Sequence, residues 1–249
     1  MISVIMGVHA VDAYLNASIQ SILDQTERNL ELIIIANGAQ HAQVAGYIKN
    51  QFSHDKRIHI IQSKIGQLSY ALNLGLDHAR FDYIARMDSD DIALPERLAK
   101  QLSHLLEFEL DMVGCDLTLI DSKGKELGEQ CYPKGSNIAR YLPFKNPFAH
   151  NTILAKKQLF IEARGYNAGF NTEDYDLWLR LGRNIVRWDN MPEKLVLYRI
   201  HDAASKGQLL GYAESAAYSL REFFLKKNPN RLFAIFVQIG KAILKPNKK

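Results

Sequence analysis

The sequence predicts an α/β fold in which a mostly parallel central sheet is covered by helices on both faces. Short apolar runs alternate along the chain with segments whose apolar residues recur at helical spacing. The runs are apolar at nearly every position, which is typical of strands buried on both faces. The chain has 249 residues, 47% of them hydrophobic, so one large domain can bury a substantial core.

The first part of the chain predicts two units of strand, helix and strand. In the first unit, apolar runs at 4–6 and 32–35 flank a helical stripe of Leu15, Ile19, Ile22 and Leu23. In the second, runs at 58–61 and 83–87 flank a stripe of Leu68, Leu72, Leu76 and Ala79. Ligands bind beyond the carboxyl ends of the strands in open sheets of this kind. The residues that follow Met87 are therefore candidates for a site.

The part of the chain that follows these units is predicted to contain both helices and strands in no regular alternation. After Pro95 a stripe of leucines predicts a helix, and residues 113–120 predict a strand that ends at a turn over 121–124. Residues 130–148 contain three prolines and lack periodicity, as expected of a loop at the rim of a site. After this loop we expect a strand at 152–154, a helix from Asp174 and strands near Val186 and Val196.

Composition argues against several classes of protein. The net charge of +4 is mild and concentrated toward the C-terminus, which does not favour nucleic-acid binding. Two cysteines are too few for a disulfide framework, so a reducing compartment is expected. No basic leader with a long apolar segment opens the chain, and no run reaches the roughly 18 apolar residues of a spanning helix. We therefore expect a cytoplasmic protein.

Asp88-Ser89-Asp90-Asp91 places three carboxylates directly after the run at 83–87. Two like charges about 6 Å apart at an effective dielectric of about 20 repel by about 3 kcal/mol, and a divalent cation reverses that sign. Residues two apart on an extended chain point to the same side, so Asp88 and Asp90 can face one ligand. Their hard oxygens suit Mg²⁺ or Mn²⁺ together with phosphate oxygens. The alternative is an acidic turn that caps the helix after Pro95.

A second acidic pair, Glu173-Asp174, directly precedes a helical pattern. A carboxylate at a helix entrance can point back into a cleft and act as a general base. The alternative is a favourable charge at a helix N-terminus, which needs no catalysis.

In order along the chain, several motifs together resemble the inverting glycosyltransferases of family 2, which have the GT-A fold. The resemblance extends from Ser3 to Ser205, and its motifs are residues 3–6, 21–26, 31–35, 71–75, 84–91, 165–166, 173–178 and 198–201.

The resemblance implies roles for individual residues. Asp90 would bind Mn²⁺ or Mg²⁺, and Asp88 would lie near the donor ribose or share the metal. Asp174 would be the general base, with Glu173 orienting the acceptor. Arg86, Arg199 and His201 would take part in donor binding, and His150 and Trp178 would line the acceptor cleft. For His150 a structural role is an equally good interpretation. For Trp178 a place in the hydrophobic core is the better one.

Two departures from the family pattern concern the donor. Where the family commonly has Asp-Asp-Gly-Ser, this chain has Ala36-Asn37-Gly38-Ala39. Asn37 can still hydrogen-bond a nucleobase through its amide, so a UDP-sugar is the expected donor. Residues 7–10 also differ from the usual loop.

The last part of the chain, 209–249, is expected to form a basic, amphipathic helical tail. Aromatic and aliphatic residues recur among arginines and lysines, which favours a helix lying on the anionic inner face of the plasma membrane. Packing on the enzyme's own core or on a second copy in a homodimer is the alternative.

Together these features predict a metal-dependent, inverting glycosyltransferase that moves a sugar from a nucleotide-diphosphate donor to a hydroxyl of a growing surface glycan, such as lipopolysaccharide or capsule, at the membrane periphery. Residues 1–124 would form the nucleotide-sugar-binding half, and residues 125–208 the acceptor-binding, catalytic half. A nucleotidyltransferase would carry a glycine-rich basic loop near its first strand, and Gly7-Val8-His9 is not one. The altered motif at Ala36-Asn37 favours a non-catalytic binding protein. Such a protein, however, would not need Asp88, Asp90 and Asp174 together.

Overall fold

The computed structural model describes residues 1–167, 169, 171–200 and 209–244. Over these residues nine strands form one sheet in the order β3-β2-β1-β4-β8-β6-β9-β5, with β7 paired to β6. In sequence order the strands are β1 (Ile2–Val8), β2 (Leu30–Asn37), β3 (Ile58–Ser63), β4 (Tyr83–Arg86), β5 (Ile92–Ala93), β6 (Met112–Ile120), β7 (Glu126–Gln130), β8 (Leu154–Lys156) and β9 (Trp188–Arg199).

Most of the sheet is parallel. Strands β3, β2, β1 and β4 run in one direction, and β6 and β9 are parallel to each other. The short strand β8 lies antiparallel between β4 and β6 and joins the two parts into one sheet. Because β1 to β4 are parallel, their carboxyl ends lie along one edge of the sheet.

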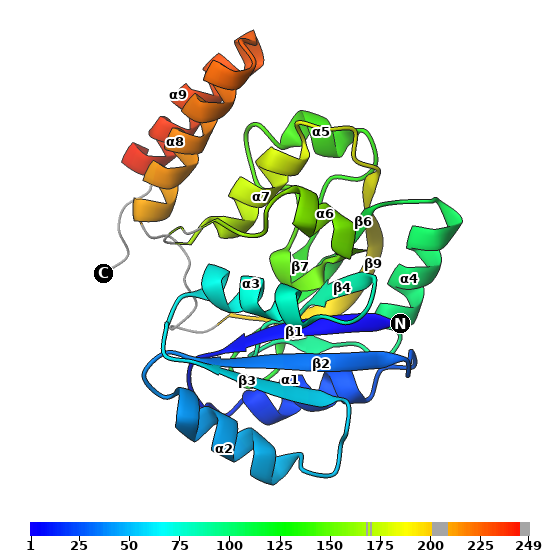
Figure 1. Ribbon diagram of the computed structural model, residues 1–249. Coiled ribbons are helices and arrows are strands. Elements are labelled where there is room, and N and C mark those ends of the chain that lie inside the picture. The colour runs from blue at the N-terminus through cyan, green and yellow to red at the C-terminus, as the bar shows by residue number, and fades with distance from the viewer. Residues whose placement is uncertain (168, 170, 201–208, 245–249) are drawn as a thin grey trace.

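Helices cover both faces of the sheet, as expected for strands that are apolar at nearly every position. They are α1 (Leu15–Leu23), α2 (His41–Gln51), α3 (Leu68–His78), α4 (Arg97–Glu107), α5 (Asn137–Tyr141), α6 (Lys157–Glu162), α7 (Glu173–Leu181), α8 (Leu209–Leu225) and α9 (Pro229–Leu244). Val4 of β1 belongs to a core cluster that includes residues of α1, α2 and α4, whereas its neighbour Ile5 belongs to a second cluster that includes residues of α3, α6 and α7. Figure 1 shows α3 on one side of β1 and α1 and α2 on the other.

The predicted strand-helix-strand units are confirmed, but several details differ. Part of the loop expected over 130–148 forms α5, and the strands expected near Val186 and Val196 are one strand, β9. Helix α2 was not predicted, because only Val44, Ala45 and Ile48 of its residues are buried and they form a weak apolar stripe. The strand expected at 152–154 begins two residues later, at Leu154. Residues His150–Thr152 instead form a 3₁₀ turn, which Thr152 closes by donating from its hydroxyl and its N–H to the carbonyl of Ala149.

Residues 209–244 of the tail form a hairpin of α8 and α9, which Figure 1 shows at the end of the molecule opposite α2. None of the helices within the described residues is long and apolar enough to cross a bilayer.

Candidate active site

The loop between β4 and β5 carries the three acidic residues found in the sequence. Carboxylate oxygens of Asp88, Asp90 and Asp91 lie within 4.8 Å of one another. The loop backbone is held from two sides, because the hydroxyl of Ser18 donates to the carbonyl of Asp88 at 2.7 Å and Nε of Arg199 donates to that of Asp90 at 2.9 Å. The half-buried carboxylates of Asp88 and Asp90 are therefore presented by a fixed backbone.

Two buried arginines lie behind this loop. Arg86 pairs with Asp88 through Nη2 and Oδ1 at 2.5 Å and also donates to the carbonyl of Met87. Arg97 is 0% exposed, and it donates to the carbonyl of Arg86 at 2.8 Å and to Oε1 of Gln101 at 3.1 Å. Burial lowers the pKa of Arg97 to about 10. The two guanidinium groups offset part of the negative charge of the acidic loop.

Asp91 has a different environment from its two neighbours. Its side chain is buried, Oδ1 accepts the backbone N–H of Arg199 at 2.8 Å, and Oδ2 accepts the side-chain amide of Asn151. Burial, followed by the charges of Asp88 and Asp90, raises the pKa of Asp91 well above its usual range. Asp91 does not cap the next helix, since α4 begins at Arg97 after Glu96. It instead ties the acidic loop to the 3₁₀ turn and to β9.

The second acidic pair opens α7. Oδ2 of Asp174 accepts the side-chain amide of Asn146 at 2.6 Å, and Oδ1 accepts the backbone N–H of Tyr175 at 2.7 Å. Burial raises the pKa of Asp174 to about 6 despite these hydrogen bonds, which lower it. Burial and the charge of Asp174 raise the pKa of Glu173 to about 7. Both groups therefore change protonation state near neutral pH.

The acidic loop and the acidic pair that opens α7 are close enough to interact electrostatically. The charge of Asp88 raises the pKa values of both Glu173 and Asp174. The pKa of the Tyr198 phenol is raised first by burial and then by the charges of Asp91, Asp88, Asp90 and Asp174. Tyr198, on β9, thus lies within electrostatic reach of both acidic groups. Its position within the motif at 198–201 is the sequence signal that could have identified it.

Asn37 lies at the same edge of the sheet as the acidic loop. It ends β2, two strands from β4, and its side chain is largely buried. The next residue, Gly38, has a φ of +83°, in the left-handed region that glycine tolerates. An added Cβ at Gly66 would lie 3.2 Å from Cα of Gly38, so the loops after β2 and β3 are in close contact beside Asn37.

The remaining predicted residues differ in what they contact. The guanidinium of Arg199 lies 4.3 Å from the centre of the Tyr14 ring and donates through Nη1 to the carbonyl of Asp121 at 3.0 Å, so it joins three loops. His150 contacts the Tyr166 hydroxyl at 3.0 Å, and burial together with Arg86 lowers its pKa well below the usual range. Trp178 is fully buried. His201 lies outside the described residues.

Trp178 occupies the core beneath the site. Its ring packs edge-on against Phe148 at 5.6 Å and against His150 at 6.1 Å between centres. With no exposed surface, it can affect a ligand only through side chains that pack against it, such as His150 and Phe148, in agreement with the core alternative.

The carboxylate oxygens of the acidic loop are suitable ligands for a hard divalent cation. Asp88 and Asp90 present half-buried carboxylates from a fixed loop, whereas the carboxylate of Asp91 is buried and both its oxygens accept hydrogen bonds. Mg²⁺ and Mn²⁺ prefer a few carboxylate ligands, with water and phosphate oxygens in the remaining positions.

Comparisons with known proteins agree on one family. The family model described as Glycosyl transferase family 2 matches residues 3–163. The O-antigen biosynthesis glycosyltransferase WbnJ of Escherichia coli is 46% identical over 247 residues, which cover 98% of this chain and 97% of that protein. The amylovoran biosynthesis glycosyltransferase AmsE of Erwinia amylovora is 35% identical over 153 residues, covering 59% of this chain and 56% of that protein.

Solved structures show the same fold. S. aureus TarS 1–349 in complex with UDP-GlcNAc has a TM-score of 0.67 at 14% identity, covering 98% of this chain and 81% of that chain. The complex of the same protein with UDP has a TM-score of 0.69 at 14% identity, covering 96% and 71%. These likenesses confirm the fold class expected from the sequence.

Proposed function

Because the chain belongs to glycosyltransferase family 2, we propose that it is a metal-dependent, inverting enzyme that transfers a sugar from a UDP-sugar to a hydroxyl of a growing surface glycan. The observation that carries this proposal is the placement of two acidic groups, Asp88-Asp90 and Glu173-Asp174, within electrostatic reach of each other. The first group can bind a metal ion that contacts a diphosphate, and the second can supply a general base. The metal-dependent, inverting transfer proposed here uses both.

Asp88 and Asp90 would hold Mn²⁺ or Mg²⁺, since their carboxylates are only half-buried whereas that of Asp91 is buried. The cation would offset the negative charge that develops on the departing diphosphate. Asp91, Asn151 and the backbone of Arg199 fix the loop that presents both ligands. Arg86 acts on the donor through its ion pair with Asp88, as a positioning residue.

Asp174 takes the proton from the acceptor hydroxyl as that oxygen forms a bond to the anomeric carbon. The bond from the anomeric carbon to the diphosphate oxygen breaks in the same step, and the electron pair leaves with UDP. A single displacement inverts the anomeric centre, so an α-linked donor gives a β-linked product. A pKa of about 6 leaves Asp174 mostly ionised at neutral pH while keeping it basic enough to accept a proton.

The remaining site residues are assigned by their place around these groups. Asn37 would contact the nucleobase at the edge of the sheet, and Arg199 and His201 would lie near the diphosphate. Glu173 would orient the acceptor, and His150, backed by Trp178, would line the acceptor cleft. The UDP and UDP-GlcNAc complexes of TarS, which has the same fold, support uridine as the base.

The organisation of the chain follows from this assignment. Residues 1–124 contribute the parallel strands and the metal loop, and residues 125–208 contribute α7 and the acceptor side. Both halves share one sheet, in which β8 joins them. Residues 209–249 form the tail.

The tail would hold the enzyme at the periphery of the cytoplasmic face of the membrane. Support comes from the outer surface of the hairpin, where large apolar side chains are exposed: Leu220, Phe224 and Leu225 on α8, and Leu232, Phe233, Phe236, Ile239 and Ile243 on α9. Exposed apolar patches of this extent mark surfaces that contact a membrane or a partner.

The test of the proposed activity is a panel of nucleotide sugars incubated with the purified chain, with and without Mn²⁺. Product is identified by mass and its anomeric configuration by NMR. We expect turnover of a UDP-sugar that depends on Mn²⁺, is lost in D90N and D174N, and gives an inverted product. The absence of metal-dependent binding by every diphosphate would support a non-catalytic binding protein, and a nucleotidyl product would support a nucleotidyltransferase.

A further inference from the structure

An open hollow of about 520 Å³ lies between α5 and α9. Its apolar wall is formed by Tyr141, Phe144 and Val237, and cations are supplied by Arg140, Lys145 and Lys241. None of the side chains that line the hollow is acidic. Arg140 and Lys145 are exposed, and Nζ of Lys145 lies 5.6 Å from the centre of the Tyr141 ring. The hollow therefore combines positive charge with an apolar surface.

Helix α9 turns its polar side toward the body of the protein. The side-chain amide of Gln238 donates to the carbonyl of Phe144 at 3.1 Å and to the Tyr175 hydroxyl at 3.2 Å, and Nζ of Lys241 donates to the same carbonyl at 2.5 Å. These contacts leave the opposite side of α9 facing solvent. That side carries the exposed stripe of Leu232, Phe233, Phe236, Ile239 and Ile243.

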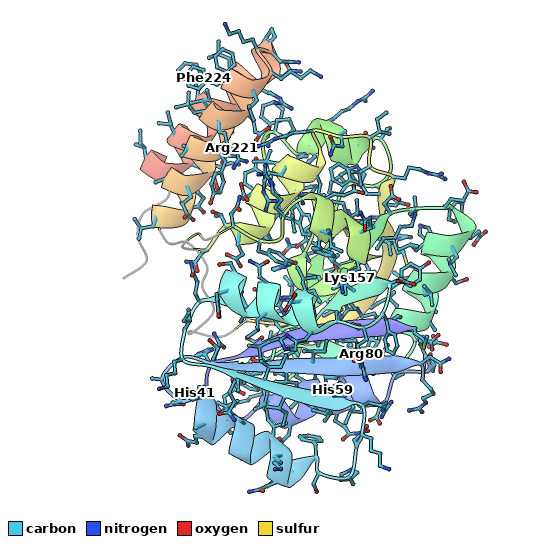
Figure 2. The ribbon with its side chains drawn as sticks, in the orientation of Figure 1. His41, His59, Arg80, Lys157, Arg221 and Phe224 are labelled. Atoms are coloured by element: carbon cyan, nitrogen blue, oxygen red, sulfur yellow. The ribbon has the colours of Figure 1, made fainter. Side chains whose placement is uncertain are left out.

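The hollow and the stripe are continuous. Phe144 in the wall of the hollow packs edge-on against Phe233 of the stripe, with ring centres 6.0 Å apart. Val237 and Lys241, which line the hollow, lie on α9 between residues of the stripe. On α8, Figure 2 shows Phe224 on the outer side of the hairpin and Arg221 on the side toward α7. A long apolar surface therefore leads directly from a cluster of cations.

This arrangement matches a ligand with a negative headgroup and long apolar chains. We propose that the hollow between α5 and α9 binds the phosphate of an anionic phospholipid, whose acyl chains lie against the stripe. Arginine binds a phosphate through two parallel N–H groups, and the stems of lysine and arginine can lie along apolar surface with their charges at the headgroup level. The inference rests on the proposed membrane contact and adds to it a defined headgroup site.

The test measures flotation of the full chain with vesicles of phosphatidylcholine and with vesicles that also contain phosphatidylglycerol. We expect tighter binding to the anionic vesicles. R140A/K145A should weaken that binding by about 30-fold, because each basic residue near an anionic surface contributes about 1 kcal/mol, and the loss of two such contributions corresponds to a factor of about 30. The charge-conserving swap R140K/K145R should keep most of the preference.

K49A/K56A is the matched control, since it removes two exposed positive charges at and just beyond α2, at the other end of the molecule. It should leave vesicle binding unchanged. If K49A/K56A weakens anionic binding as much as R140A/K145A, only overall charge matters and the headgroup site is wrong. Equal melting temperatures of the variants exclude misfolding as the cause.

Other outcomes separate this inference from the contact on which it rests. If the chain floats with neither kind of vesicle, the proposed membrane contact itself fails. If it floats equally with both, the contact stands and the headgroup site is rejected. Binding of glycerol phosphate in solution that R140A/K145A abolishes, without vesicle binding, would assign the hollow to a soluble phosphate. A dimer by light scattering that F233S/F236S dissociates would assign the stripe to a second copy.

Discussion

At Asp174, burial opposes the ionised state that the proposed reaction needs. A carboxyl whose pKa rises on folding binds its proton more tightly in the folded state, so its contribution to stability is greatest below its ordinary pKa. That contribution is lost as the pH rises through about 6, and through about 7 for Glu173. The ionised form that the proposed reaction needs therefore predominates at a pH where it lowers the stability of the fold.

We predict that kcat/KM rises with pH between about 6 and 7 and then levels off, since the base must be ionised. In N146A the rise should move to higher pH, because the amide that stabilises the Asp174 carboxylate is lost. Initial rates with a fixed UDP-sugar and acceptor across the pH range test this. A profile of N146A displaced to lower pH would contradict the assignment of Asp174 as the base.

D174N should lower turnover by about 10²–10⁴-fold while leaving binding of the UDP-sugar intact. At pH 8 it should also unfold at the same temperature as the wild type or higher, because a neutral amide does not carry the cost of an ionised, largely buried carboxylate. Single-turnover kinetics, calorimetric titration with donor and thermal melting measure the three properties. Loss of donor binding in D174N would place this residue in the donor site instead.

N151A should lower the free energy of unfolding by about 1–3 kcal/mol, because it leaves a buried carboxylate oxygen of Asp91 without its donor. The loosened loop should also bind Mn²⁺ more weakly. Urea unfolding and Mn²⁺ dependence of donor binding check both effects, with the exposed substitution N50A as a control. Unchanged Mn²⁺ dependence in N151A would mean that Asp91 does not position the metal ligands.

At the scale of elements, a network of charged groups connects α7 to the hairpin. Asp176 of α7 is 0% exposed, and its carboxylate accepts from Nε of Arg180 at 2.8 Å and from Nη1 of Arg221 on α8 at 2.5 Å. Glu222 of α8 in turn pairs with Arg183 at 2.5 Å and with Arg231 of α9 at 3.4 Å. Buried pairs of this kind fix geometry, and removal of one partner is costly.

R221M should therefore detach the hairpin without unfolding the sheet. We expect faster hydrogen exchange in α8 and α9, unchanged exchange in β1 and β2, and a loss of roughly 1–3 kcal/mol of local stability, since Asp176 keeps Arg180 as a partner. Hydrogen exchange with mass spectrometry measures each segment. R187A is the matched control, because its pair with Glu109 is exposed and should contribute under about 1 kcal/mol. Equal effects of both variants would reject a structural role for the buried network.

At the scale of the whole molecule, one sheet brings segments that are distant in sequence to a single edge. Strands β1 to β4 end near Asn37 and Asp88, and β8 connects them to the part that carries α7 and β9. Asp91 is bonded to Asn151, 60 residues away, and to Arg199, 108 residues away. A ligand that spans this edge would bind only the folded chain.

UDP and Mn²⁺ together should raise the melting temperature, whereas either alone should have little effect. Binding at a concentration 100 times the dissociation constant adds about 2.7 kcal/mol to stability, which corresponds to several degrees for a chain of this size. Thermal melts with UDP, Mn²⁺, both, and both with EDTA test this expectation. D90N should abolish the joint shift, and a full shift with UDP and EDTA would contradict a metal bridge.

The sequence alone determined the parallel strands, the carboxylates at the end of β4 and the acidic pair that opens α7. These features depend on local periodicity and on residues adjacent in the chain, which a single sequence displays directly. The same local signals failed for α2, whose stripe is weak, and for residues 150–152, where the Thr152 side chain closes a turn.

Only the tertiary structure decided which partners the site residues have. Asn146 and Asn151 belong to one short segment of the sequence, yet the first bonds Asp174 and the second Asp91. The sequence predicts an amphipathic tail, whereas the fold decides that Gln238 and Lys241 face inward and that the apolar stripe faces out. Such choices depend on contacts between distant segments, whose free energies no local pattern records.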